Sequence, residues 1–364
     1  MHDWLTVPGG AEETLRHVLP LIDGPIYAAQ YNPARFPWLA DRDVRAHWIS
    51  HLPLSRTRHY LYAPVLADAY RALDLRGHSF VVAMSHTFAH CARPDPEATM
   101  MAYYYTVARS LWLPEIDDRA GLHLEGVNGR VRGVVARRLK RLDLEAARRP
   151  DHIVAISRTT AARIQRFYGR TADAVVYPPV ETAKWGDVTR RNGRLGALVW
   201  GRFIDYKRFD LAIEAARLGG FPLQVVGAGP QEARLKRLAA GAPGIVFHGR
   251  LEDAELKSLM AECRAVLFPG YEDFGIVPVE GMAAGLPVVA YGAGGAAETV
   301  SDQGGILFGE QTPAALADAY ATLDGREWEP GPLRLRADAF NERRFASEFA
   351  RELAAAVEKR PRRT

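Results

Sequence analysis

The fold of this chain is decided by one stretch, Tyr271-Glu272-Asp273-Phe274-Gly275-Ile276-Val277-Pro278-Val279-Glu280-Gly281-Met282-Ala283-Ala284-Gly285-Leu286-Pro287. An apolar run typical of a buried strand precedes it at 264–269, and another follows it at 287–291. Pro278 suits the first turn of a helix, and Gly285 suits the residue just after its end. The stretch is therefore predicted to form a loop and a helix between two strands.

The start of this predicted helix is a potential binding site. The helix opens near Gly275, and its free N–H groups and positive dipole end favour phosphate. Glu272 in the loop and Glu280 in the helix flank that end, and a carboxylate suits the vicinal diol of a ribose or hexose. Together these features describe a sugar-nucleotide site, whereas either glutamate alone is more simply interpreted as a solvated helix residue.

The whole stretch resembles the E-x7-E signature of the family 4 glycosyltransferases. The run from Glu272 to Glu280 is similar to the consensus of the branch of mannosyltransferases that assemble surface polysaccharides. The resemblance implies an α/β GT-B fold, in which two Rossmann-like, doubly wound domains face a cleft. It also implies a retaining transfer from a nucleotide-sugar, with Glu272 in a catalytic role and Phe274, Gly275, Ile276 and Glu280 in contact with the donor.

Length and composition agree with a two-domain globular protein. The chain has 364 residues, of which 48% are hydrophobic, so each of two domains can bury a core. A formal net charge of +4 is too small to indicate a nucleic-acid partner without a basic motif. Cys91 and Cys263 lack metal-ligand spacing and predict reduced thiols in the cytoplasm. Neither a bilayer-spanning run nor a signal peptide is seen in this sequence.

Strands and helices alternate through the first half, which predicts a doubly wound N-terminal domain over residues 1–181, and the resemblance implies that this domain binds the acceptor. Ser157 is a predicted N-cap, and the two prolines at 178–179 mark the domain's end before a polar linker at 182–194. The predicted strands lie at 25–30, 79–84, 101–106, 151–156 and 174–177, with helices at 59–75 and 159–168.

The chain opens on Met1–Leu5, followed by the glycine turn Gly9-Gly10 and an amphipathic helix to about Leu21. Such a turn normally follows a core strand, and its backbone then approaches a ligand. We therefore take Gly9 and Gly10 as candidate donor contacts. Because almost no strand precedes them, we expect either a longer protein or a degraded first strand.

The second half predicts a Rossmann-like, nucleotide-sugar-binding domain over residues 195–335. A C-terminal segment at 336–364 carries a final helix that crosses back onto the first domain in the proteins that this one resembles. The predicted strands lie at 195–200, 222–226, 244–247, 265–268, 287–290 and 305–308, and the helices at 210–218, 231–239, 253–262, 275–284, 313–323 and 341–358.

Two cations, Arg202 and Lys207, follow the first strand of the second domain. The carboxyl edge of a doubly wound sheet is where ligands bind, so both side chains face the same crevice as the Glu272 loop. Arg202 can bind phosphate oxygens with its fork of donors, and Lys207 supplies a point charge. Surface charges on a loop are the alternative. The segment resembles the family's diphosphate-binding Gly-Arg…Lys, which assigns both residues a catalytic role.

Weaker signals follow the next two strands. Gly227 belongs to a Gly-x-Gly that lacks the third glycine of a dinucleotide fingerprint, and a tight turn explains it without a ligand. We take it as lining the donor crevice. Arg250 and Leu251 follow the next strand, where the resembling enzymes place the nucleotide base.

No metal or other cofactor is expected. Arg202, Lys207 and the helix N–H groups can stabilise the departing diphosphate. The acids at 117–118 and 143–145 do not form an Asp-x-Asp metal site, and we interpret them as helix-cap or surface residues. In the resembling enzymes the leaving phosphate is thought to take the acceptor's proton, so a separate base is not required.

One position departs from the family pattern. The branch usually carries Tyr-x-His-Thr-Pro-x-Arg in the first domain, and here Tyr105 stands where its donor-contacting histidine is expected. This departure puts the usual sugar, or full activity, in doubt. His86 and His90 follow a strand at the facing edge, where one could serve the acceptor, although a lone histidine is more often structural.

The arginine-rich stretch at 129–149 carries apolar residues at helical spacing. A solvated helix face packed on the sheet is the simpler interpretation, and peripheral contact with the inner membrane face is the alternative. The predicted partners are a nucleotide-sugar, with GDP-mannose favoured over UDP- or other GDP-sugars, and a lipid-linked sugar, polysaccharide or natural product with a free hydroxyl. The competing functions are a GT-B phosphorylase, pseudo-transferase or epimerase, and a non-catalytic partner protein.

Overall fold

The computed structural model describes residues 1–114, 129–191 and 195–359. Its contacts divide the chain into two compact units. Unit 1 comprises Met1–Tyr177 and the chain from Phe345 onwards, and unit 2 comprises Pro178–Arg344. Within the described ranges, no helix is both long and apolar enough to cross a membrane.

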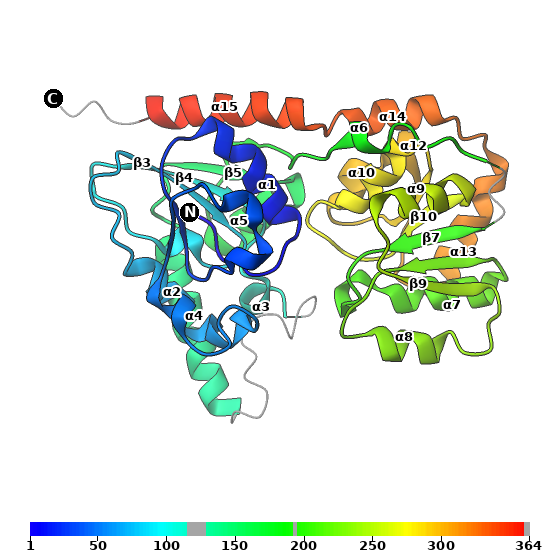
Figure 1. The fold of residues 1–364 in the computed structure, drawn as a ribbon, viewed down its shortest axis with the longest axis horizontal. Helices are drawn as coiled ribbons and strands as arrows, with labels where there is room; N and C mark the ends of the chain where they lie inside the picture. Colours follow the sequence, from blue (N-terminus) through cyan, green and yellow to red (C-terminus); the bar gives the residue numbers. More distant parts are fainter. Residues whose placement is uncertain (115–128, 192–194, 360–364) are drawn as a thin grey trace. The chain divides into compact units, whose positions relative to one another are not determined.

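Unit 2 is built on a six-stranded parallel sheet with the order β12-β11-β10-β7-β8-β9. Strands β10, β7 and β9 of this sheet are labelled in Figure 1. The chain extends the sheet from β7 to one edge, then returns to place β10 on the other side of β7. This reversal is the strand order of a doubly wound Rossmann-like sheet. The strands are β7 (Ala197–Trp200), β8 (Leu223–Val226), β9 (Ile245–Gly249), β10 (Ala265–Phe268), β11 (Val288–Tyr291) and β12 (Gly305–Phe308).

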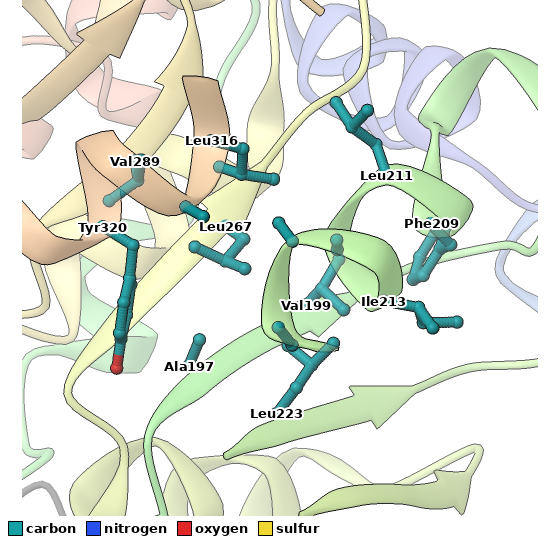
Figure 2. Close-up of a cluster of buried hydrophobic side chains, with 14 of the residues drawn as sticks. Ala197, Val199, Phe209, Leu211, Ile213, Leu223, Leu267, Val289, Leu316 and Tyr320 are labelled. Atoms are coloured by element: carbon teal, nitrogen blue, oxygen red, sulfur yellow. The ribbon is translucent and has the colours of Figure 1, made fainter. Parts of the chain in front are cut away.

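Helices cover both faces of this sheet, which is why most of its strands are apolar along their whole length. Figure 2 shows Leu211 and Leu316, from the helices of one face, beside Val199 and Leu267 from the strands, and these four side chains belong to one buried cluster. The helices are α6 (Thr182–Trp185), α7 (Phe209–Gly219), α8 (Glu232–Leu238), α9 (Asp253–Glu262), α10 (Ile276–Ala283), α11 (Gly295–Thr299), α12 (Ser301–Gly304), α13 (Pro313–Ala321) and α14 (Pro330–Asp338), with 3-10 turns at 205–207 and 322–325.

Unit 1 has a four-stranded parallel sheet, β3-β4-β5-β6, and a parallel pair, β1-β2. The opening segment Met1–Leu5 joins them, because His2 forms parallel bridges with both Ala28 and Met84. It forms only isolated bridges, yet it occupies the place of the first strand of a doubly wound sheet. The strands are β1 (Ile26–Ala28), β2 (Val44–Ala46), β3 (Phe80–Ser85), β4 (Thr99–Tyr104), β5 (His152–Ala155) and β6 (Ala174–Val175).

The helices of unit 1 pack on this sheet from several parts of the chain. The Ser157 hydroxyl accepts a hydrogen bond from the Thr160 N–H, so the predicted N-cap is confirmed. Leu139 and Leu142 are buried in the unit 1 core. The helices are α1 (Gly10–Val18), α2 (Ala63–Arg71), α3 (Arg109–Trp112), α4 (Gly129–Ala146), α5 (Arg158–Tyr168) and α15 (Glu342–Glu358), with 3-10 turns at 19–21, 33–35, 37–39, 48–51, 59–62 and 89–91.

From Phe345 onwards, α15 is part of the unit 1 core. Phe345 and Phe349 are fully buried, and their rings lie 6.2 and 5.4 Å from that of Tyr103 on β4. One turn further along, the Glu352 carboxylate lies 3.0 Å from His152 Nε2 on β5. Aromatic packing and this polar contact together hold the helix on the sheet.

The stretch at 182–194 is not the polar linker that the sequence predicted. Its first residues form α6, and Trp185 and Val188 are buried. The charged residues beside them are paired, since Lys184 contacts Asp253 at 2.6 Å and Asp187 contacts Lys257 at 2.8 Å. Burial of Trp185 and Val188 therefore packs this stretch against the rest of unit 2, although most of its residues are polar. Residues 192–194 lie outside the described part.

Replacing Phe349 by alanine tests the docking of α15. The deletion leaves a cavity against Tyr103, so we expect the free energy of unfolding of unit 1 to fall by about 3–5 kcal/mol. Urea unfolding followed by circular dichroism measures the change. Val357→Ala is the matched control, because Val357 is 54% exposed on the same helix. Equal midpoints for the two variants would contradict the packing described.

Candidate functional site

The reversal of strand order in unit 2 brings two loops together at the carboxyl ends of β7 and β10. The first loop carries Arg202 and Lys207, and the second carries Glu272. Because β7 and β10 are paired neighbours whose outgoing connections run to opposite edges, this is the point at which doubly wound sheets form their ligand-binding crevice. The predicted neighbourhood of these three residues therefore follows from the sheet topology.

Lys207 and Glu272 form an ion pair in this crevice. The Lys207 ammonium donates a hydrogen bond to Glu272 Oε1 at 2.6 Å, and both side chains are less than a fifth exposed. Although burial lowers it, the facing Glu272 carboxylate raises the pKa of Lys207 above its ordinary value, so the lysine stays charged. An ammonium has three donors, so this one can hold Glu272 and a second anion together.

Arg202 lies on the exposed side of the same loop. Its side chain makes neither an ion pair nor a hydrogen bond with the residues that the structure describes, and it is close enough to Lys207 to lower the pKa of that lysine. Two cations therefore face one paired carboxylate. The local excess of positive charge favours an anionic ligand.

The N-terminus of α10 opens beside these loops. Gly275 precedes the helix with φ of +89°, a conformation that favours glycine, and no side chain of the described residues caps the first turn. Phe274 is buried against the ring of Phe340, at a centroid distance of 5.6 Å, which fixes the turn. The N–H groups of the first turn, starting at Ile276, are left for a ligand.

Glu280, one turn into α10, lies in a partly buried position. The Trp200 indole at the end of β7 donates a hydrogen bond to its carboxyl group. Burial raises the pKa of Glu280 to about 7, against the opposing effects of Lys184 and the Trp200 hydrogen bond. The two acids of the motif therefore differ, since Glu272 has a lysine at hydrogen-bond distance, whereas Glu280 has an indole hydrogen bond and the weaker influence of Lys184 and Lys207.

Close backbone packing defines the remaining loops at this edge. A side chain on Gly227 would collide with the Gly201 carbonyl, and one on Gly295 would collide with the backbone of Phe274. The glycine turn after β8 is therefore a packing requirement, as its weak motif suggested. Arg250 and Leu251 follow β9 at the same edge, two strands away from β7.

The other predicted donor contacts, Gly9 and Gly10, belong to unit 1. They lie at the start of α1, after the opening segment. Tyr105 follows β4, and its hydroxyl donates a hydrogen bond to the Ala11 carbonyl at 2.8 Å. Tyr105, at the position where the resembling enzymes carry a histidine, therefore stabilises the start of α1.

A buried polar cluster in unit 1 corrects one prediction. Asp143 is fully buried in α4, and it accepts a hydrogen bond from Trp112 Nε1 at 2.6 Å and lies 3.0 Å from His90 Nε2. Its interpretation as a cap or surface acid is wrong, because the helix turns it inward with Leu139 and Leu142. Residues 117–118, the other acids considered, lie outside the described part.

His90, Cys91 and Asp143 are the one group of metal-capable side chains found within 4.8 Å of one another among the described residues. Their chemistry suits zinc. However, both His90 nitrogens already face protein atoms, since Nδ1 is hydrogen-bonded to Ser85 Oγ at 2.9 Å and Nε2 lies 3.0 Å from Asp143 Oδ1 without hydrogen-bond geometry. The cluster is explained as a buried hydrogen-bond network, and metal independence stays a prediction.

The arginine-rich helix α4 has some apolar residues that are buried and others that are exposed. Leu139 and Leu142 are buried, whereas Val131 and Val134 near its start are 51% and 57% exposed among arginines. The packed helix face is confirmed. Contact of this helix with a membrane stays a prediction.

Asp3 and Trp200 were not among the predicted site residues. Asp3 lies in the strand-like opening segment, directly after the bridged residue His2, and its carboxylate accepts backbone hydrogen bonds from the loop after β3. Trp200 is the last residue of β7 and reaches Glu280. Both lie at the carboxyl end of a central strand, which is the positional signal that could have identified them.

Comparison with known proteins places residues 186–324 in a match to the family model described as glycosyl transferases group 1. The chain is 32% identical over 212 residues to D-inositol 3-phosphate glycosyltransferase of Acidothermus cellulolyticus, covering 50% of this chain and 46% of the relative. It is 28% identical over 218 residues to a GDP-mannose-dependent alpha-(1-6)-phosphatidylinositol monomannoside mannosyltransferase of Mycobacterium tuberculosis, covering 49% and 57%. The chain thus spans about half the length of these curated relatives.

Among solved structures, the chain resembles the crystal structure of Anabaena HepE in complex with UDP and glucose. The TM-score is 0.70, and the match covers 97% of this chain and 98% of that chain at 17% identity. At this identity the likeness establishes the fold. The GT-B fold expected from the sequence is confirmed.

Glu280 predicts how the stability of unit 2 changes with pH. Between about pH 4.5 and 7 the folded chain keeps a proton on Glu280 that the unfolded chain has released. The free energy of unfolding therefore falls as pH rises through this range, by up to about 3 kcal/mol, and Glu280→Gln removes that slope. Urea unfolding at a series of pH values measures it. Glu327→Gln, at an exposed position, is the control, and equal slopes in wild type and Glu280→Gln would contradict the prediction.

Proposed function

We propose that this protein is a glycosyltransferase that moves a sugar from a nucleotide-sugar to a hydroxyl acceptor, with unit 2 binding the donor. The observation that carries the proposal is the ion pair of Lys207 with Glu272 beside the exposed Arg202, at the switch point of a doubly wound sheet. All three residues lie inside the glycosyl transferases group 1 match. A nucleotide diphosphate supplies the anion that this crevice favours.

The proposed roles of these residues follow from where negative charge develops during sugar transfer. When the glycosidic bond to the diphosphate breaks, negative charge grows on the leaving phosphate. Arg202, Lys207 and the N–H groups near Ile276 can stabilise that charge, and they do so without a metal. Glu272 and Glu280 can accept hydrogen bonds from the hydroxyls of the donor's sugars.

We further propose that the transfer retains the anomeric configuration. The acceptor hydroxyl attacks on the face from which the diphosphate departs, forming the new glycosidic bond as the old one breaks. The acceptor's proton passes to the leaving phosphate, so charge and protons balance without a separate base. This part of the proposal rests on the resemblance of the Glu272–Glu280 segment to retaining enzymes.

GDP-mannose is the favoured donor, and UDP-sugars are the alternative. The segment's resemblance to mannosyltransferases supports the first, as does the name of the mycobacterial relative. The complex of the structural neighbour with UDP favours the second. The acceptor is a lipid-linked sugar, a polysaccharide or a natural product.

A panel of UDP-, GDP-, ADP- and dTDP-sugars, run with EDTA, tests the proposal. We expect one nucleotide class to raise the melting temperature and to release free sugar slowly. Arg202→Ala and Glu272→Ala should each lower that release by about 100- to 1000-fold, since each removes a group that acts at the reacting centre. Differential scanning fluorimetry and chromatography of the released sugar are the measurements.

Arg237→Ala and Glu327→Ala are matched controls at exposed positions of unit 2 and should behave as wild type. If no nucleotide raises the melting temperature, the donor site proposed for unit 2 is wrong. Binding without any release of sugar would favour a pseudo-transferase or partner protein. Sugar phosphate formed only with inorganic phosphate present would favour a phosphorylase.

A further inference from the structure

The switch point of unit 1 carries a second set of polar residues. The opening segment and β3 are neighbours there, and their carboxyl ends lead into the glycine turn and the loop His86–Ala89. In a doubly wound sheet this is the place where a ligand binds. Unit 1 therefore has its own candidate crevice, separate from the donor residues of unit 2.

The Asp3 carboxylate organises this crevice. It is fully buried, and its Oδ2 accepts hydrogen bonds from the N–H groups of His86 and Thr87 at 2.5 and 2.8 Å. Its Oδ1 accepts from Phe88 and Ala89, each at 2.7 Å. Four backbone donors on one carboxylate fix the loop after β3. These four hydrogen bonds are enough to explain Asp3 as a residue that only stabilises the fold.

A fifth group, the His86 ring, also faces Asp3. Its buried Nδ1 lies 2.9 Å from Asp3 Oδ2, and the side chain as a whole is 21% exposed. Although burial opposes both effects, the pair holds the pKa of Asp3 well below its usual range and raises the pKa of His86. Because Nδ1 faces the carboxylate at contact distance, Nε2 on the other edge of the ring is the nitrogen that a ligand would meet.

The groups around His86 are mostly aromatic and uncharged. The Trp4 ring meets it edge to face at a centroid distance of 4.3 Å, and Tyr105 lies 6.2 Å away. His2 lies 6.0 Å away and is neutral, because burial lowers its pKa to about 3. Among the described residues, the other charged groups that act on His86 are Glu12 and Arg109, with opposite effects.

We propose that His86, oriented by Asp3, binds a sugar hydroxyl of the acceptor through Nε2, with Trp4 beside it. The proposal rests on the proposed glycosyltransferase function and names the acceptor class as one that offers a sugar ring. An imidazole nitrogen accepts a hydrogen bond from a hydroxyl, and an indole suits the apolar face of a sugar. Tyr105 has a different role, since its hydroxyl donates its proton to the Ala11 carbonyl and so supports α1.

Nitrogen NMR of the full chain labelled with 15N-histidine gives the first test, using octyl glucoside, galactoside and mannoside as probes. The spectrum of His86→Phe identifies the His86 signals. We expect the tautomer with its proton on Nδ1, and a change in the Nε2 signal when one of the glycosides is added. His51, exposed elsewhere in unit 1, is the internal control. The proposal is overturned if none of the three glycosides moves the His86 signal, or if His51 moves equally.

Kinetics with the responding glycoside give the second test. His86→Phe keeps an aromatic ring but removes the nitrogen, so kcat/KM for the glycoside should fall about 10- to 100-fold. Release of free sugar to water should change less than about threefold, because the donor site is intact. Equal losses in both reactions would mean a structural role and would overturn the proposal.

The pH profile separates positioning from structure. Nε2 accepts a hydrogen bond only from the neutral ring, so transfer to the glycoside should decline as pH falls through the pKa of His86. The same decline should be absent from hydrolysis and from His86→Phe. If nucleotides fail to stabilise the wild type, the proposed function fails first; if they bind normally and the glycosides leave His86 unchanged, this inference alone fails.

Discussion

The structure depends on one topological constraint, the return of the chain to the middle of each parallel sheet. Parallel strands need crossover connections, so every loop that follows a strand emerges at the same edge. Where the strand order reverses, the chain leaves two neighbouring strands toward opposite edges of the sheet. In unit 2 this occurs between β7 and β10, and in unit 1 between the opening segment and β3. The charged residues of interest lie at these two places.

Buried carboxylates show how the surroundings assign each acid its state. Asp3 has four backbone donors and a histidine, and it therefore remains an anion although it is fully buried. Glu272 has a lysine ammonium at hydrogen-bond distance. Glu280 has an indole donor and the weaker influence of Lys184 and Lys207, too little to offset burial, so its proton is retained to a higher pH. The number and charge of the hydrogen-bond donors around each carboxyl group, more than its depth of burial, therefore determine whether it is ionised.

Much of the fold could be predicted because periodicity and glycine positions are local signals. The strands of unit 2 and the bounds of α9 follow apolar runs and their capping residues closely. The sequence missed β2, whose side chains are only partly buried, and α14, whose glycine and prolines argue against a helix although they lie in its first turn. The stretch at 182–194, before β7, was predicted to be a linker because its composition is polar. Composition does not reveal the tertiary packing that buries Trp185.

The candidate site was predicted in its residue types but not in its pairings. The motif around Glu272 and the cations after β7 pointed to the correct edge of the sheet. That Lys207 binds Glu272, and that Trp200 reaches Glu280, depends on side-chain directions across separate loops. Asp3 was unremarkable in sequence because its partners are backbone N–H groups more than 80 residues away, which carry no side-chain signature.

The path of the last helix has a consequence for engineering. The chain leaves unit 1 after Tyr177 and returns to it at Phe345, so unit 1 is assembled from two separate pieces of sequence. Unit 2 is, in genetic terms, an insert. A chimera that exchanges unit 2 must therefore be made with two junctions, and a simple fusion at 177 would leave the aromatic surface under Phe345 and Phe349 without its cover.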